Sequence, residues 1–316
     1  MEILITCPPM LRAIEHYRQR FVEKGLTPIT PDVTQIVPEA ELIEMVPRYD
    51  GWIIGDDPAT AAVFEAGAAG RLKAVVKWGV GVDNVDFGAC KRLGLPVSNT
   101  PGMFGREVAD VALGYVIALA RETFAIHRSV VEGGWAKPAG ISLAGKTAAL
   151  IGFGDIGRNV AKRLLALEMN VVAYDPFFKP AEGLEAVQPA QWPDRFDEAD
   201  FIVFTCALTP QNRHMLDAGA LEAAKNGLRI VNVARGPLVD ECALIAALET
   251  GKVHSAALDV FEIEPLPMES PLRTFGDRCI FGSHNGSNTI DAVIRTSERA
   301  IDMMHNFLTN PSAAII

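Results

Sequence analysis

The chain has 316 residues, of which 49% are hydrophobic and 22% are charged. This length is natural for two domains, and the composition is that of a compact globular protein. The formal net charge of -10 argues against nucleic acid or an anionic membrane surface as the partner, because both are negatively charged.

The N-terminal residues, MEILITCPPM, include an early glutamate and no basic segment before the apolar one, so no signal peptide is expected. The most apolar long stretch, 108–120, contains Asp110 and is too short to span a bilayer. The five cysteines are scattered, and none forms a CxxC pair. We therefore expect reduced thiols in a cytoplasmic protein without a metal site.

Short apolar runs alternate with helical patterns along the whole chain. The strand-like runs are 2–6, 51–55, 73–78, 147–153, 170–175, 201–206, 229–234, 254–260 and 279–282. Helical patterns stand out at 106–134, 155–168 and 291–308, the last with one apolar face. Because the strands are continuously apolar, helices should cover both faces of each sheet. The predicted fold class is α/β, with two doubly wound parallel-sheet domains.

The pattern breaks once, at 96–102. This segment reads PVSNTPG, so two prolines and a glycine follow the first set of strands. A second set of strands and helices runs from there to about residue 283. We predict a domain boundary at the break, and the pattern alone does not assign the last helix to either domain.

The stretch LIGFGDIG places Gly152, Gly154 and Gly157 in G-x-G-x-x-G spacing. The spacing alone is common in glycine-rich loops. Here it closes an apolar strand and opens a helix, with Asp155 and Ile156 at the helix start. Backbone N–H groups and the positive helix end would therefore face a pyrophosphate, which predicts a dinucleotide site.

Asp175 ends the next predicted strand. A carboxylate at this position can accept hydrogen bonds from the adenosine ribose hydroxyls, and it repels a 2′-phosphate. Pro176, Phe177 and Phe178 follow, without an arginine that would bind such a phosphate. The sequence therefore favours NAD over NADP.

Three further blocks follow in order: AKNGLRIVNVARGPLVDECALIAAL (224–248), ALDVFEIEPLP (257–267) and SHNGS (283–287). Together with KWGVGVDNVD (77–86), they make the chain resemble the D-2-hydroxyacid dehydrogenase family, which includes D-phosphoglycerate and glyoxylate dehydrogenases. The resemblance extends over nearly the whole chain, and the blocks stand in the family's order and spacing.

This resemblance implies a discontinuous first domain, because the C-terminal helix returns to it in this family. Residues 1–99 and 286–316 would form a flavodoxin-like substrate domain. Residues 100–285 would form a Rossmann NAD-binding domain.

The resemblance also implies catalytic residues. Arg235 matches the arginine that holds the substrate carboxylate, His284 the catalytic histidine and Glu264 its carboxylate partner. Imidazole titrates near the working pH and can take the hydroxyl proton, and a carboxylate behind it stabilises the charged ring. A guanidinium can hold a carboxylate in bidentate fashion. Taken singly, these residues could instead be a turn histidine, a strand-capping arginine and a solvated acid.

Further contacts follow from the same resemblance. The N–H groups of Val80 and Gly81 would take the substrate carboxylate, although this loop could also be a plain turn capped by Asp83. Lys77 matches a basic position that binds substrate, and Asp259 a residue that contacts the nicotinamide amide. Other positions implied to line the cofactor site are Cys206, Val233, Ala234 and Gly286. Cys206 is expected to be a small buried residue rather than a reactive thiol.

The phosphoglycerate enzymes of the family carry arginine after the strand that matches 51–55, whereas this chain has Gly55-Asp56-Asp57. Two carboxylates would disfavour a phosphate dianion, so we expect an uncharged or hydroxylated substrate tail, as in glyoxylate or hydroxypyruvate. Lys77 and Arg106 are the cations that could offset the negative charges of these two aspartates.

The resemblance therefore predicts an NAD-dependent oxidoreductase that interconverts a small D-2-hydroxy acid and its 2-oxo acid. Segment 106–134 resembles the family's dimerisation element and implies a homodimer, unless its apolar face covers its own sheet. Asp110 and Asn288 depart from the glutamate and threonine that the family usually has, which concerns the subfamily rather than the chemistry. Two alternatives remain: a nucleotide-sensing binding module like the C-terminal-binding corepressors, and a phosphoglycerate dehydrogenase.

Overall fold

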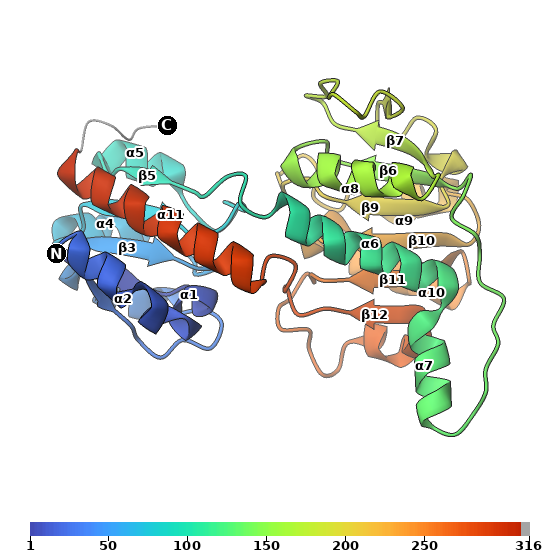
Figure 1. Cartoon of the computed structure of the whole chain (residues 1–316), viewed down its shortest axis with the longest axis horizontal. Coiled ribbons are helices and arrows are strands. Elements are labelled where there is room, and N and C mark those ends of the chain that lie inside the picture. Colours follow the sequence, from blue (N-terminus) through green and yellow to red (C-terminus); the bar gives the residue numbers. More distant parts are fainter. Residues whose placement is uncertain (311–316) are drawn as a thin grey trace. The chain divides into compact units, whose positions relative to one another are not determined.

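The computed structural model describes residues 1–310, and the chain divides into two units (Figure 1). Unit 1 consists of Met1–Phe104 and the segment that starts at Asn288, and unit 2 is Gly105–Ser287. The predicted substrate domain also included 311–316, which lie outside the described residues.

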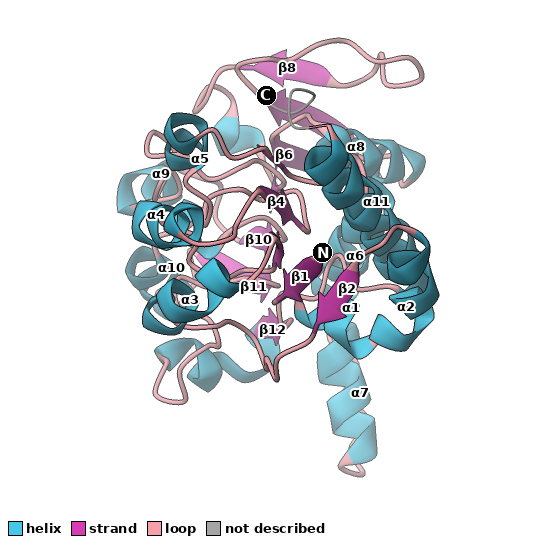
Figure 2. Ribbon diagram, turned by 90° about the vertical axis from the view of Figure 1, so that its left-hand side faces the viewer, coloured by secondary structure: helices cyan, strands magenta, loops and turns pink. Residues whose placement is uncertain are grey.

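Unit 1 is built on a five-stranded parallel sheet in the order β2-β1-β3-β4-β5. Its strands are β1 (Glu2–Ile5), β2 (Thr27–Ile29), β3 (Gly51–Ile54), β4 (Ala74–Lys77) and β5 (Val97–Ser98). Its helices are α1 (Pro8–Arg12), α2 (Ile14–Glu23), α3 (Glu39–Met45), α4 (Ala61–Ala69), α5 (Phe87–Leu93) and α11 (Ile290–Thr309), with a 3₁₀ turn η1 (Val46–Arg48). Figure 2 shows α3, α4 and α5 on one side of this sheet, with α2 and α11 on the other. Every residue of β3 and β4 is buried, as expected for strands covered on both faces.

The C-terminal helix α11 packs in unit 1 against β3, β4 and α2. Its buried side includes Val293, Ile301 and Met304. The Trp78 indole N–H, just after β4, donates to Ser297 Oγ at 3.1 Å. The sequence pattern left this helix unassigned, and its apolar stripe completes the core of unit 1.

Unit 2 contains a seven-stranded parallel sheet in the order β12-β11-β10-β9-β6-β7-β8. Its strands are β6 (Thr147–Ile151), β7 (Asn170–Tyr174), β8 (Gln188–Ala190), β9 (Phe201–Phe204), β10 (Leu228–Asn232), β11 (Val253–Leu258) and β12 (Cys279–Phe281). Its helices are α6 (Gly105–Arg121), α7 (Thr123–Val131), α8 (Asp155–Ala166), α9 (Ala218–Ala223) and α10 (Glu241–Glu249), with 3₁₀ turns η2 (Phe196–Glu198), η3 (Gly236–Leu238) and η4 (Pro271–Arg278). The predicted class, α/β with two parallel sheets, is confirmed.

Two local features differ from the sequence prediction. The strands β2, β5 and β8 were not predicted, because they are edge strands of two or three residues that give no apolar run. Segment 106–134 is not one helix but α6 and α7, separated by Glu122 in the left-handed region at φ 52°. Helix α6 packs on α8 and contacts β10 and β11, whereas α7 has no buried residue. The apolar positions after Glu122 therefore do not serve the core of unit 2.

Candidate active site

The predicted site residues of unit 2 lie in loops that follow its parallel strands. Gly152 follows β6, Asp175 follows β7, Cys206 follows β9, Arg235 follows β10, Asp259 and Glu264 follow β11, and His284 follows β12. Because the carboxyl ends of parallel strands share one edge of the sheet, these loops lie along that edge (Figure 1). The strand sequence reverses at β6, between β9 and β7, where nucleotides bind in folds of this kind.

His284 and Glu264 form a direct pair. The His284 Nδ1 atom lies 2.8 Å from Glu264 Oε2, and each side chain is 27% exposed. The other carboxylate oxygen, Oε1, accepts the backbone N–H of Phe261 at 3.0 Å. A carboxylate beside Nδ1 keeps a proton on that nitrogen, which directs proton exchange to Nε2. The pair can therefore accept and release a proton at one defined nitrogen.

The backbone around the histidine is unusual. His284 has φ 53°, in the left-handed region that non-glycine residues rarely adopt. Its N–H donates to the Asp259 carbonyl oxygen at 2.7 Å, and Gly286 N–H donates to Asp259 Oδ2 at 2.8 Å. Asp259, predicted to contact the nicotinamide, is 3% exposed and is engaged by this loop. The histidine is thus held by its neighbours in a conformation that costs energy.

Arg235 lies in the loop after β10, which Asn232 holds in place. The Asn232 Oδ1 atom accepts the N–H of Ala234 at 3.0 Å, and its Nδ2 donates to the Arg235 carbonyl at 2.8 Å. A Cβ on Gly236 would lie 1.9 Å from the Phe261 carbonyl, so this loop passes directly against the one that carries Glu264. No role was predicted for Asn232 from the sequence. The feature that could have indicated one is an amide side chain at the end of an otherwise apolar strand.

The glycine loop is shaped as a dinucleotide site requires. Gly152 N–H donates to the Tyr174 carbonyl at 2.9 Å, which ties the loop to β7. A Cβ on Gly157 would lie 2.1 Å from the Gly152 oxygen, so the loop and α8 meet too closely for any side chain. A Cβ on Gly154, the N-cap of α8, would meet nothing within 4 Å. Space therefore remains beside the N-terminus of α8, and these residues fit a pyrophosphate.

Asp175 is fixed beside that loop. Its Oδ2 accepts the N–H of Phe153 at 2.6 Å, and its Oδ1 accepts the N–H of Phe177 at 2.8 Å. Each carboxylate oxygen can accept a second hydrogen bond, so ribose hydroxyls remain possible partners.

The remaining predicted cofactor residues surround the same edge. Asp155 begins α8 with Ile156, while Val233 and Ala234 are 7% and 8% exposed. Burial raises the pKa of the Cys206 thiol to about 12, so the side chain stays a thiol at neutral pH. The side chain is only partly buried, rather than buried as expected, and its raised pKa disfavours a reactive thiolate.

In unit 1, the two neighbouring aspartates have different surroundings. Asp57 is fully buried and accepts N–H groups from Val37 at 2.8 Å and Gly55 at 3.0 Å. Asp56 Oδ1 lies 2.9 Å from the Nζ atom of Lys77, which is 2% exposed. The prediction that both carboxylates face the substrate tail is therefore wrong for Asp57, because its hydrogen bonds tie it into the interior of unit 1.

The predicted carboxylate-binding loop follows β4. Gly79 N–H donates to Thr100 Oγ1 at 2.8 Å, and the Asn99 amide donates to the Val80 carbonyl at 2.9 Å. Helix α5 is capped by Asp86, which accepts the N–H of Ala89, and not by Asp83 as the alternative reading supposed. Binding of substrate by Val80, Gly81 and Lys77 stays a prediction.

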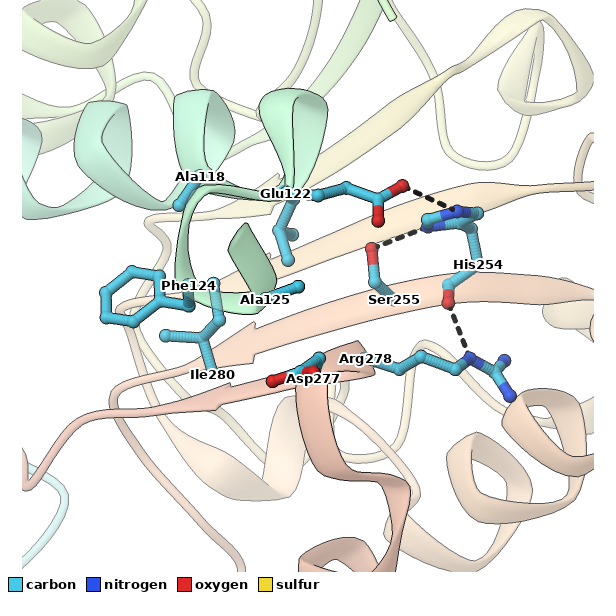
Figure 3. A pocket seen from close by; sticks show the side chains of 10 residues that line it. Ala118, Glu122, Phe124, Ala125, His254, Ser255, Asp277, Arg278 and Ile280 are labelled. Carbon is cyan, nitrogen blue, oxygen red and sulfur yellow. Dashed lines mark hydrogen bonds and ion pairs between the residues drawn. The ribbon is translucent and has the colours of Figure 1, made fainter. Parts of the chain in front are cut away.

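A pocket of about 60 Å³ lies elsewhere in unit 2, among α6, α7, β11 and β12 (Figure 3). In it, His254 lies between Ser255 Oγ (3.0 Å from Nδ1) and Glu122 Oε1 (3.7 Å from Nε2). Burial, together with Arg229, lowers the pKa of His254. The pocket is smaller than a cofactor needs and contains no predicted site residue. Within residues 1–310, no helix is long and apolar enough to span a membrane, and no His, Cys, Asp or Glu cluster could hold a metal ion.

The doubly wound sheet and its glycine loop are those of a nucleotide-binding domain. Residues 113–286 match the family model described as D-isomer specific 2-hydroxyacid dehydrogenase, NAD binding domain. The chain belongs to this family of NAD-binding oxidoreductases, and the resemblance found in the sequence is confirmed.

Individual relatives extend the comparison. A hydroxypyruvate reductase of Thermotoga maritima is 38% identical over 83% of this chain and 86% of its own length. A D-3-phosphoglycerate dehydrogenase of Archaeoglobus fulgidus is 36% identical over 92% of this chain and 54% of its own length, so this chain spans about half of that protein. The apo structure of D-lactate dehydrogenase from Escherichia coli superimposes with a TM-score of 0.83 at 27% identity, covering 98% of this chain and 97% of that one.

Proposed function

We propose that the protein is an NAD-dependent oxidoreductase that interconverts a small D-2-hydroxy acid and the corresponding 2-oxo acid. The observation that carries the proposal is the His284–Glu264 pair, joined at 2.8 Å on the carboxyl edge of the unit 2 sheet. An acid–base pair on the edge that also carries the glycine loop suits a reaction that moves a proton and a hydride together.

Each residue has one task in the proposed mechanism. In the oxidation direction, His284 Nε2 takes the hydroxyl proton and Glu264 stabilises the imidazolium that forms. In the reduction direction, His284 returns that proton to the carbonyl oxygen of the 2-oxo acid. Arg235 holds the substrate carboxylate through its planar guanidinium. Residues that include Gly154 and Asp175 would hold NAD or NADH, which would supply the hydride chemistry at the substrate's C2 atom.

The cofactor is proposed to bind beside Gly154, with Asp175 at its adenosine ribose. The N-terminus of α8 would face the pyrophosphate. The Asp175 charge would repel the 2′-phosphate of NADP, and this supports a preference for NAD.

The substrate tail is proposed to be uncharged or hydroxylated. Lys77 is the basic residue predicted to meet the tail, and Asp56 Oδ1 lies 2.9 Å from its ammonium group. A lysine already paired with a carboxylate offers little net charge to a phosphate. The hydroxypyruvate reductase relative supports this choice of tail. A phosphorylated tail, as in the phosphoglycerate relatives, is the alternative.

A homodimer is proposed, with α7 and the residues after it as the contact. Phe124, Val130, Val131 and Trp135 are 51%, 46%, 72% and 75% exposed. Apolar side chains gathered on a helix that serves no core of its own are typical of a protein interface. A sedimentation measurement that finds only monomer at micromolar concentration would refute this part.

The free cysteines are consistent with the cytoplasmic location expected from the sequence.

The test of the function is a turnover assay with NADH and a panel of 2-oxo acids. The panel is glyoxylate, hydroxypyruvate, pyruvate and 3-phosphohydroxypyruvate. We expect measurable reduction of at least one acid whose tail is uncharged, and loss of that activity in His284→Ala. If NADH binds but no acid is reduced, the protein is a nucleotide-sensing binding module and the proposed activity is wrong.

A further inference from the structure

Two residues that the proposed mechanism does not use as acid or base lie behind the histidine loop, residues 282–286. Asp259 comes directly after β11 and is 3% exposed. Tyr115 projects from α6, and its hydroxyl lies beside the Asp259 carboxylate. Burial and this carboxylate raise the pKa of Tyr115, so its hydroxyl keeps its proton at neutral pH. No role was predicted for Tyr115, because a tyrosine in an apolar helix has no distinguishing pattern.

Asp259 contacts three consecutive backbone N–H groups of the loop. Its carbonyl oxygen accepts His284 N–H at 2.7 Å. Its carboxylate oxygens accept the next two, Asn285 N–H at 3.2 Å on Oδ1 and Gly286 N–H at 2.8 Å on Oδ2. The loop also begins against this residue, since a Cβ on Gly282 would lie 2.0 Å from Asp259 Oδ1 and 2.5 Å from the Tyr115 hydroxyl.

These contacts explain how His284 keeps a left-handed backbone. A non-glycine residue at φ 53° returns to an extended or helical conformation unless its surroundings hold it. In that conformation its Nδ1 atom meets Glu264, which the Phe261 N–H fixes independently. The 2.8 Å contact between imidazole and carboxylate therefore depends on both anchors.

We propose that Tyr115 and Asp259 are positioning residues that hold His284 in the left-handed conformation in which its Nδ1 meets Glu264. Tyr115 orients the Asp259 carboxylate, and Asp259 fixes the loop. This rests on the proposed function, because it takes His284 as the group that transfers the proton. It does not depend on the predicted contact of Asp259 with the nicotinamide.

The experiment compares Asp259→Asn and Tyr115→Phe with the wild type and with Tyr174→Phe. The amide in Asp259→Asn has one acceptor oxygen, so at least one loop N–H loses its partner. Tyr115→Phe keeps the ring and removes only the hydroxyl. Tyr174→Phe is the matched control, because it removes a tyrosine hydroxyl bond to the Asp194 carbonyl in the same unit and keeps the Tyr174 backbone carbonyl that binds the glycine loop.

Steady-state rates are measured from pH 5 to 10 with the best 2-oxo acid and NADH. For Asp259→Asn we expect kcat to fall about 10–100-fold, the scale for a misplaced reacting group. In Tyr115→Phe, which changes no predicted cofactor contact, the KM for NADH should stay close to the wild-type value. The limb of the pH–rate profile that reports His284 should move to lower pH, because the imidazolium loses contact with Glu264. Tyr115→Phe should change kcat and the profile in the same direction by less, and Tyr174→Phe should change neither.

Two outcomes would overturn the proposal. A lower kcat and melting temperature with an unmoved pH profile would mean that both residues only stabilise the fold. A raised KM for NADH with an unmoved profile would mean that Asp259 acts on the cofactor alone. If Asp259→Asn does not fold, the Tyr115→Phe profile decides. Full activity of His284→Ala would instead refute the proposed function. That assay uses neither Asp259→Asn nor Tyr115→Phe.

Discussion

Alanine substitutions at two glycines of the nucleotide loop should affect the stability of the fold and the affinity for the cofactor separately. Gly157→Ala would place a methyl group 2.1 Å from the Gly152 oxygen, which is backbone and cannot rotate away. Such overpacking costs about 2 kcal/mol, which for a unit of this size lowers the melting temperature by roughly 4–8 °C. Gly154→Ala places its methyl where nothing lies within 4 Å, at an ordinary φ of -76°. We expect its melting temperature without cofactor to match the wild type.

Cofactor affinity should show the opposite contrast, because Gly154→Ala rather than Gly157→Ala should affect it directly. The methyl of Gly154→Ala would occupy the space beside the α8 N-terminus that the pyrophosphate needs, because only a glycine allows so close an approach. We expect NADH to bind at least about tenfold more weakly, a loss of about 1.4 kcal/mol. Differential scanning fluorimetry of the apo protein and a fluorescence titration with NADH measure the two effects. Wild-type affinity in Gly154→Ala, or an equal fall in melting temperature for both variants, would refute the assignment of this loop.

Four other predictions concern single residues. His284→Ala should lower kcat about 10²–10⁴-fold while NADH affinity, measured by titration, stays near wild type. Asp175→Ala should weaken NAD more than NADP, and a wild type that uses both equally would contradict the ribose contact. With NAD, the wild type should show a higher kcat/KM for D-glycerate than for 3-phospho-D-glycerate. Asp56→Asn should reduce this ratio of the two kcat/KM values. Glu65→Gln, which makes an equal change of charge on α4, should leave the ratio unchanged. Cys206, with its pKa raised to about 12, should react with iodoacetamide only slowly at pH 7 and faster as the pH rises, which mass spectrometry can follow.

The sequence predicted those parts of the fold that depend on continuous burial. Each of the nine apolar runs is a strand, because a strand covered on both faces must be apolar throughout. The break at Glu122 could not be predicted, since both sides of it are helical and apolar. The two sides differ only in whether their apolar side chains pack into the core of unit 2, which depends on tertiary contacts.

The candidate site divides in the same way. Residues with a fixed local context, such as Gly154 and Asp175, could be predicted from their places after a strand. Tyr115 could not, because its role depends on contact with a loop distant in sequence. Asn232 binds residues only two and three positions later, and its one signal in the sequence is an amide at the end of an apolar strand. Asp56 and Asp57 show the limit most clearly. They are identical neighbours after one strand, yet one pairs with Lys77 and the other turns inward to backbone N–H groups.

The strand order of unit 2 gives the proposed mechanism its layout. The loops with Arg235, Glu264 and His284 follow the neighbouring strands β10, β11 and β12. The loops with Gly154 and Asp175 follow β6 and β7, and β9 lies between the two groups. In the proposed mechanism, the proton-transfer residues and the predicted pyrophosphate and ribose contacts therefore lie on separate halves of one sheet edge, held by separate hydrogen bonds. Because distant sites with no shared partners contribute additively, a double variant of Gly154 and Tyr115 should show the sum of the two single effects in transition-state free energy. Strong non-additivity would mean that the two halves are coupled, and the histidine loop would then depend on the nucleotide as well as on Asp259.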